Sequence, residues 1–163
     1  MSTFMKELLE VEEKLQFTSF SNEDALKLGL IVIDLAKEVY QRGVSVNIER
    51  NRQVLFTYFM EGTSYENLSW MSRKKMIVER FNHSSMYVGE IYSARDTTAN
   101  DASFLPPSEY QAVGGCYPIF IKNTGAVGSL SISGMTAEED HELCVKALTK
   151  LQELKNESVI SSK

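Results

Sequence analysis

The chain has 163 residues, of which 43% are hydrophobic and 24% are charged, and its formal net charge is −5. These values are typical of one globular domain, here spanning residues 1–163, that needs no disulfide or metal to fold. A concentrated basic face is missing, which argues against a nucleic-acid partner. The sequence contains no apolar run near the roughly 20 residues that a membrane span requires, so we expect no membrane partner.

The cysteines and the N-terminal segment indicate the cytoplasm. Cys116 and Cys144 lack the spacing of a redox or zinc motif and are expected to be reduced. Residues 1–15 carry charges throughout instead of the apolar centre of a signal peptide. We therefore predict a cytoplasmic protein.

The first part of the chain predicts two helices followed by a hairpin. An amphipathic helix over residues 3–17 has a narrow apolar stripe, which would pack on its own domain or at an oligomer interface. Ser21 is a good N-cap for a second helix that ends near Gly43. Alternation over residues 44–49 predicts a half-buried strand, and the apolar run over residues 54–60 predicts a central strand covered on both faces.

The middle of the chain predicts two more helices and a loop. The longer helix begins at Ser64 and ends near Asn82, and a short one spans residues 85–92. Residues 95–110 are polar and contain a double proline, so we expect no regular structure there.

The stretch from Val113 to Leu148 carries the most explicit local signals. A strand over residues 113–121 contains Pro118, which restricts it to an edge or an irregular position. A tight turn at Asn123–Gly125 leads into a second strand over residues 127–133.

A final helix opens with a capping box at Thr136 and Glu139, and the tail over residues 157–163 is expected to fray. Helices that alternate with hairpins favour an α+β domain with a mainly antiparallel sheet.

Three motifs in this stretch resemble the C-terminal half of the GlcG/HbpS-like, haem-degrading-domain family. They are Gly114-Gly115-Cys116-Tyr117-Pro118, the run from Gly125 to Leu130, and Ser133-Gly134 followed by Thr136 and Glu138-Glu139-Asp140. Trp70, Arg73, Lys74 and Ser84-Ser85 are similar to an intracellular branch of the same family. At Cys116 and Tyr117 the chain departs from other branches, which have a further glycine and a small apolar residue.

The resemblance implies a profilin-like three-layer α/β/α domain that forms a homo-oligomer. It also implies haem or iron binding, with haem degradation as the associated activity.

A haem site would need an apolar slot and an axial ligand. Cys116, beside the glycine pair, is one candidate ligand, and His83, at the end of the Ser64 helix, is another metal-ligand candidate. Arg73 and Lys74 would hold the propionates. His141 is flanked by Asp140 and Glu142 and is expected to be solvated.

Two alternatives remain open at this point. Arg73 and Lys74, with the exposed amides of Gly114 and Gly115, would bind a small anion such as a phosphate or carboxylate, unless the basic run is a solvated helix face. The second alternative is a homo-oligomeric assembly or interaction protein without catalysis. The sequence contains no nucleophile motif, so no catalytic residue is assigned and enzymatic activity stays open.

Overall fold

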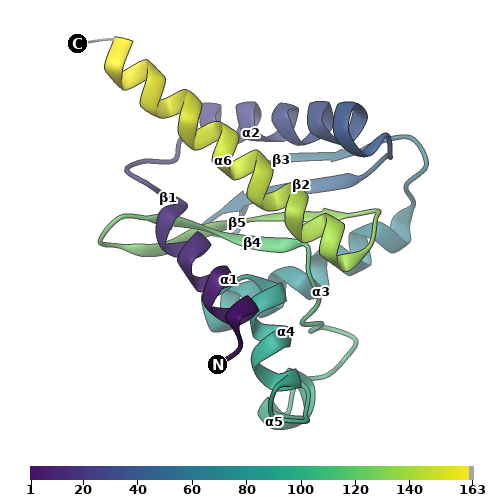
Figure 1. Cartoon of the computed structure of the whole chain (residues 1–163). Helices are drawn as coiled ribbons and strands as arrows, with labels where there is room; N and C mark the ends of the chain where they lie inside the picture. The colour runs from purple at the N-terminus through teal and green to yellow at the C-terminus, as the bar shows by residue number, and fades with distance from the viewer. Residues whose placement is uncertain (162–163) are drawn as a thin grey trace.

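The computed structural model describes residues 1–161 and contains a five-stranded sheet in the order β1-β4-β5-β2-β3 (Figure 1). The strands are β1 (Gln16–Phe17), β2 (Ser45–Arg50), β3 (Gln53–Phe59), β4 (Cys116–Ile121) and β5 (Gly125–Ser133). Every neighbouring pair is antiparallel except β1 and β4. The predicted α+β fold with a mainly antiparallel sheet is confirmed.

Helices cover both faces of the sheet, which gives three layers. α2 (Asn22–Leu35), continued by a π-helical turn (Ala36–Tyr40), and α6 (Ala137–Ser161) lie on one face, and α3 (Tyr65–Phe81) lies on the other. α1 (Thr3–Lys14), α4 (Ser85–Ser93) and α5 (Ala99–Ser103) gather beside β4, at the bottom of Figure 1. Within residues 1–161, none of these helices is both long and apolar enough to cross a membrane.

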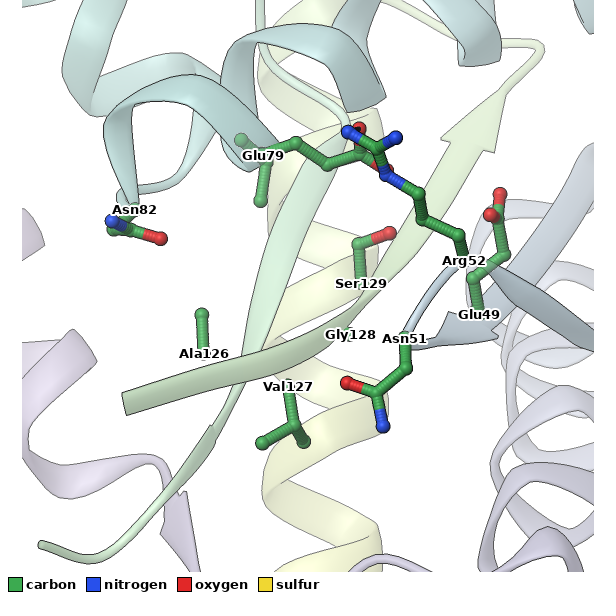
Figure 2. A pocket seen from close by; sticks show the side chains of 10 residues that line it. Glu49, Asn51, Arg52, Glu79, Asn82, Ala126, Val127, Gly128 and Ser129 are labelled. Carbon is green, nitrogen blue, oxygen red and sulfur yellow. Dashed lines mark ion pairs between the residues drawn. The ribbon is translucent and has the colours of Figure 1, made fainter. Parts of the chain in front are cut away.

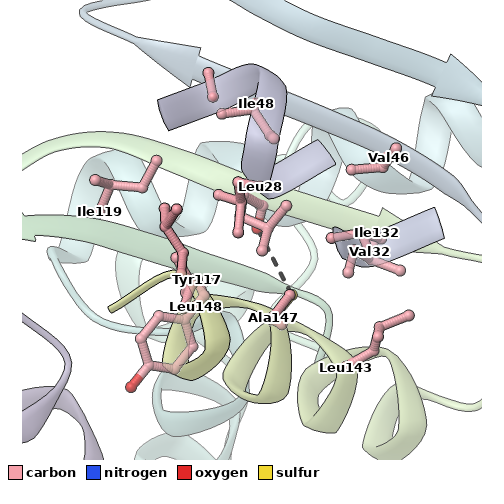
Figure 3. Packing of buried hydrophobic residues seen from close by; sticks show 14 of the residues in the cluster. Leu28, Val32, Val46, Ile48, Tyr117, Ile119, Ile132, Leu143, Ala147 and Leu148 are labelled. Carbon is pink, nitrogen blue, oxygen red and sulfur yellow. Dashed lines mark hydrogen bonds between the residues drawn. The ribbon is translucent and has the colours of Figure 1, made fainter. Parts of the chain in front are cut away.

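The two faces of the sheet differ in chemistry because strand residues alternate in direction. Toward α2 and α6 the strands present large apolar side chains, which form the main core (Figure 3). Its fully buried members include Leu28, Val32, Val46, Ile48, Ile119, Leu130, Ile132, Leu143 and Leu148. Toward α3 the same strands present small polar residues, among them Ser45, Ser129, Ser131 and Ser133. Short side chains on this face allow α3 to lie close to the sheet.

Local signals at the helix ends were predicted correctly. Ser21 Oγ accepts a hydrogen bond from the Asp24 N–H at 3.1 Å, and the Asp24 carboxylate accepts one from the Ser21 N–H at 2.8 Å. Thr136 and Glu139 form the corresponding box at the start of α6. These bonds satisfy backbone donors that the first helical turn leaves free.

The apolar run over residues 54–60 was wrongly predicted to be a central strand. It forms β3 at the edge of the sheet, where Val54 is 51% and Tyr58 49% exposed. An apolar run reports how well a segment suits a strand, whereas the number of neighbouring strands follows from the sheet order.

Other segments also differ from expectation, among them the strand predicted over residues 113–121, which begins at Cys116. The helix predicted over residues 3–17 ends at Lys14, and Gln16 and Phe17 instead form β1, which pairs with β4. The apolar stripe of α1 packs on α4 of its own chain. The segment over residues 95–110 contains α5, which Thr98 caps. Residues 157–161, which were expected to fray, continue α6, and residues 162–163 lie outside the described part.

Phe104 ends α5 with φ of 55°, a left-handed conformation that strains a bulky residue, and its side chain is 94% exposed. We expect Phe104→Gly to raise the free energy of unfolding by about 0.5–1 kcal/mol, because glycine adopts this conformation without the steric cost. Phe104→Ala is the matched control, since it removes the same exposed ring but keeps Cβ. Urea denaturation of the three proteins measures the difference, and equal stability of the two variants would contradict the expectation.

Candidate functional site

Lys74, one of the predicted ligand-binding residues, belongs to α3 and is buried between this helix and the sheet. Its Nζ donates to the Ile132 carbonyl at 2.9 Å and to the Asp140 carboxylate at 3.1 Å, and both ionic side chains are almost fully buried. Burial raises the pKa of Asp140, while the Lys74 ammonium and the Met135 N–H oppose that rise. The pair links α3 to β5 and α6. Its two opposite charges neutralise each other inside the domain.

The glycine pair lies beside this ion pair. A Cβ at Gly115, whose φ is 127°, would collide with Lys74 Nζ and the Ile132 carbonyl, and one at Gly114 would collide with the Ala137 carbonyl. Because these two glycines have no side chains, the Lys74 ammonium and the first residue of α6 can lie directly against their backbone. Close packing accounts for both glycines without a ligand.

Arg73 lies apart from Lys74 although the two are adjacent in sequence. Its guanidinium stacks on the Trp70 ring at 4.0 Å and lies 3.6 Å from Glu66. A cavity of about 230 Å³ above Lys74 is lined by Trp70, Lys74, Val113, Ser133, Met135, Ala137 and Asp140, without Arg73. An anion would have to compete with Asp140 for Lys74 and with Glu66 for Arg73.

Cys116 is fully buried on the face of the sheet that α3 covers. Its Sγ lies 3.2 Å from the Ser131 hydroxyl, and burial raises its pKa to about 12. Cys144 is also a buried free thiol, as the sequence predicted. At neutral pH Cys116 is a protonated thiol and not the thiolate that binds iron.

His83 follows the C-terminal end of α3 and is held by a buried carboxylate. Its Nδ1 lies 2.7 Å from Glu12 Oε2, and Glu12 Oε1 accepts a bond from the Ser84 N–H at 2.8 Å. The imidazole contacts the Tyr87 ring and is 39% exposed. A carboxylate that orients an imidazole is common around metal-bound histidines. No group of three or more His, Cys, Asp or Glu side chains among residues 1–161 is arranged to hold a metal ion.

His141 was wrongly expected to be solvated. It is half-buried, its Nδ1 lacks a hydrogen-bond partner among the described residues, and its ring lies 5.8 Å from that of Tyr117. The Tyr117 hydroxyl is fully buried and also lacks such a partner. Burial lowers the pKa of His141 to about 4. The signal was present, because His141 precedes Cys144 and Leu148 at helical spacing and so lies near their buried stripe.

A small polar pocket of about 210 Å³ lies between the β2–β3 turn and the end of α3 (Figure 2). Both acidic side chains in it already have cationic partners. Glu49 lies 3.0 Å from Lys75, and Glu79 lies 3.6 Å from Arg52. The pocket therefore has no free charge to attract a ligand.

An apolar groove of about 690 Å³ lies between α2 and β3, and we call it the α2–β3 groove. Its lining consists of Leu30, Ile33, Lys37, Gln41, Arg42, Gly43, Phe56, Tyr58, Met60 and Glu61. The volume is in the range of small-molecule sites. Sequence reasoning missed this groove because it treated the β3 run as covered; the tyrosine in that run was the one indication that part of it meets water.

The chain matches known proteins over most of its length. A model of the family described as haem degrading protein HbpS-like matches residues 20–149. The chain belongs to the HbpS-like family. It is 38% identical over 144 residues to a UPF0303 protein of Streptomyces coelicolor, covering 88% of this chain and 90% of the relative. A UPF0303 protein of Psychromonas ingrahamii is 37% identical over 147 residues, covering 90% and 92%.

Solved structures share the fold of this HbpS-like protein. The crystal structure of Ybr137w protein has a TM-score of 0.84 at 30% identity and covers 91% of this chain and 88% of that one. A PduOC–haem complex has a TM-score of 0.68 at 18% identity, covering 80% and 94%. HbpS has a TM-score of 0.66 at 18% identity, covering 83% and 92%. At these last two identities the likeness shows the fold alone.

Lys74→Met should lower the free energy of unfolding by about 3–5 kcal/mol, because it leaves the Asp140 carboxylate buried without a counter-charge. The double variant Lys74→Met/Asp140→Leu should recover most of that loss. Lys27→Met, at an exposed position of α2, is the control for removing a lysine charge. Urea denaturation at pH 7 measures all four proteins, and a double variant as unstable as the single one would refute the pairing argument.

His141 should make the fold less stable in mild acid. Its folded pKa of about 4 is below the ordinary value of 6.5, so the unfolded chain binds the proton more readily between these pH values. Stability is therefore lost as pH falls through this window, by at most about 1.4 kcal/mol per pH unit. His141→Leu should flatten the dependence of unfolding free energy on pH from 7 to 4. An unchanged slope in that variant would contradict this assignment.

Proposed function

We propose that the protein binds haem and that the α2–β3 groove is the binding site. Membership of a family described as haem degrading supports haem association, and a protein of the same fold has been crystallised with haem. The observation that carries the location is the groove itself. Its lining combines apolar side chains with the cations Lys37 and Arg42 and the Tyr58 phenol.

The residues of the groove suit the three parts of a haem. Leu30 and Phe56 offer apolar surface for the macrocycle. Lys37 and Arg42 are the cations that would hold the propionates, although Arg42 also donates to the Gly134 carbonyl at 3.0 Å. The Tyr58 phenol oxygen is the group in this lining that would bind the haem iron.

The chemistry of such a site depends on the iron that haem supplies when bound. The chain's own contribution is to bind and orient the macrocycle and to exclude water with Leu30 and Phe56. We propose haem degradation as a further activity of the bound haem, and we assign no catalytic residue to it. We also propose that the protein is cytoplasmic. Its two free thiols support this location.

The sequence candidates fit haem less well than the groove does. Cys116 is buried as a protonated thiol, and Lys74 is already paired with Asp140. The His83 imidazole is oriented by a carboxylate, as in many metal ligands. However, His83 lines none of the five pockets described among residues 1–161. His83 therefore serves as the competing hypothesis in the experiment below.

A second candidate function is a homo-oligomeric assembly that needs no cofactor. The edge strand β3 favours it, because its half-exposed apolar side chains are typical of surfaces that another chain covers. Small-anion binding by Arg73, Lys74 and the glycine pair stays a prediction from the sequence.

Hemin titration followed at the Soret band tests the haem proposal. We expect a saturable spectral change at micromolar hemin, and Tyr58→Phe should shift the band and weaken binding by about tenfold or more, as loss of an axial ligand does. Tyr65→Phe is the matched control, since Tyr65 is an exposed tyrosine outside the groove.

Two results would overturn this proposal. Absence of saturable binding in the parent protein refutes haem association altogether. Loss of binding in His83→Ala, with Tyr58→Phe unchanged, refutes the groove and moves the site to the α3–α4 junction.

A further inference from the structure

The outer edge of β3 offers backbone hydrogen-bonding groups that no strand within residues 1–161 uses. β3 is the last strand in the sheet order, and its inner side pairs with β2. The Met60 N–H donates to the Val44 carbonyl at 3.1 Å, so Met60 faces inward. Because antiparallel residues alternate between the two sides, the N–H and C=O groups of Thr57 and Phe59 point away from β2.

This edge lacks the features that usually prevent strand pairing. The opposite edge, β1, is only two residues long, which is a common protection. β3 has seven residues, with no proline or lysine, and its one irregularity lies at the Val54 end. From Phe56 to Phe59 the strand is regular and partly exposed. A long regular edge of this kind is a template for another strand.

Charges at the two ends of β3 indicate which strand would pair with it. The strand itself is uncharged, Arg52 precedes it and Glu61 follows it. Arg52 is 82% exposed although it lies 3.6 Å from Glu79 of its own chain, and Glu61 is also exposed. When two copies of β3 run antiparallel, Arg52 of one copy comes near Glu61 of the other at both ends. The edge is therefore complementary to itself.

We propose that two copies of this chain associate through antiparallel pairing of β3 with β3, which joins their sheets into one. The partner is a second copy of the same chain, related by a two-fold axis near the middle of the strand. The proposal rests on the assembly alternative given above and specifies its interface. It does not depend on haem, because the pairing uses backbone groups of Thr57 and Phe59. Glu61 lines the groove as well, but the haem proposal assigns it no role.

A charge-swap experiment tests the self-complementary ends. By light scattering coupled to gel filtration, the parent should be at least dimeric at micromolar concentration. Arg52→Glu should raise the dissociation constant about tenfold or more, because like charges then meet at both ends of the interface. Arg52→Glu/Glu61→Arg should restore association to within about threefold of the parent.

A backbone experiment tests the edge itself. Thr57→Pro removes an outward N–H and no ladder bond to β2, so we expect a folded monomer. Thr57→Val is the matched control, because it also loses the hydroxyl bond to the Val46 carbonyl but keeps the N–H. Circular dichroism checks the fold of each variant. If Thr57→Pro does not fold, the charge swap decides alone.

The outcomes separate the two proposals. A parent protein that is monomeric at micromolar concentration overturns both the assembly alternative and the β3 pairing. An oligomer that is unaffected by Arg52→Glu and by a folded Thr57→Pro leaves assembly standing and overturns the β3 interface. Association of β3 only with an unrelated protein strand also overturns it.

Discussion

The arrangement of the domain depends on the ion pair between Lys74 and Asp140. One ammonium contacts the carbonyl of Ile132 in β5 and the carboxylate at the start of α6, so it links α3 to two elements that lie much later in the sequence. Two charges buried this deeply are tolerable only when each has a partner and further hydrogen bonds. Gly115 leaves the space for this pair, since a side chain there would occupy the position of the ammonium.

The pair also explains why the two sides of the sheet are built differently. α2 and α6 pack on large aliphatic residues, whereas α3 lies on serines and Cys116, where a lysine stem and its charge can be accommodated. The space around Lys74 is consequently occupied by the protein's own groups. Any ligand of drug-like size finds more room at the periphery, between α2 and the exposed strand β3.

The predicted site was therefore partly assembled and partly filled. Lys74, Gly114 and Gly115 do meet, but they meet around Asp140, which the sequence indicated only as part of a family motif. Arg73 points elsewhere because successive residues of a helix differ by about 100° in direction, and it stacks on Trp70. No local sequence pattern indicated the α2–β3 groove, since its walls come from segments that are separate in sequence. The groove is open to solvent because β3 is the edge strand of the sheet.

The sequence by itself determined the helix starts at Ser21, Ser64 and Thr136, the β4–β5 turn, the α+β class and the family motifs. These features depend on contacts within a few residues, namely capping bonds, turn geometry and side-chain periodicity. Only the tertiary structure decided that β3 is an edge, that residues 16–17 pair with β4 and that Lys74 is buried. Each of these depends on which distant segment lies alongside, and burial and strand neighbours are properties of that arrangement.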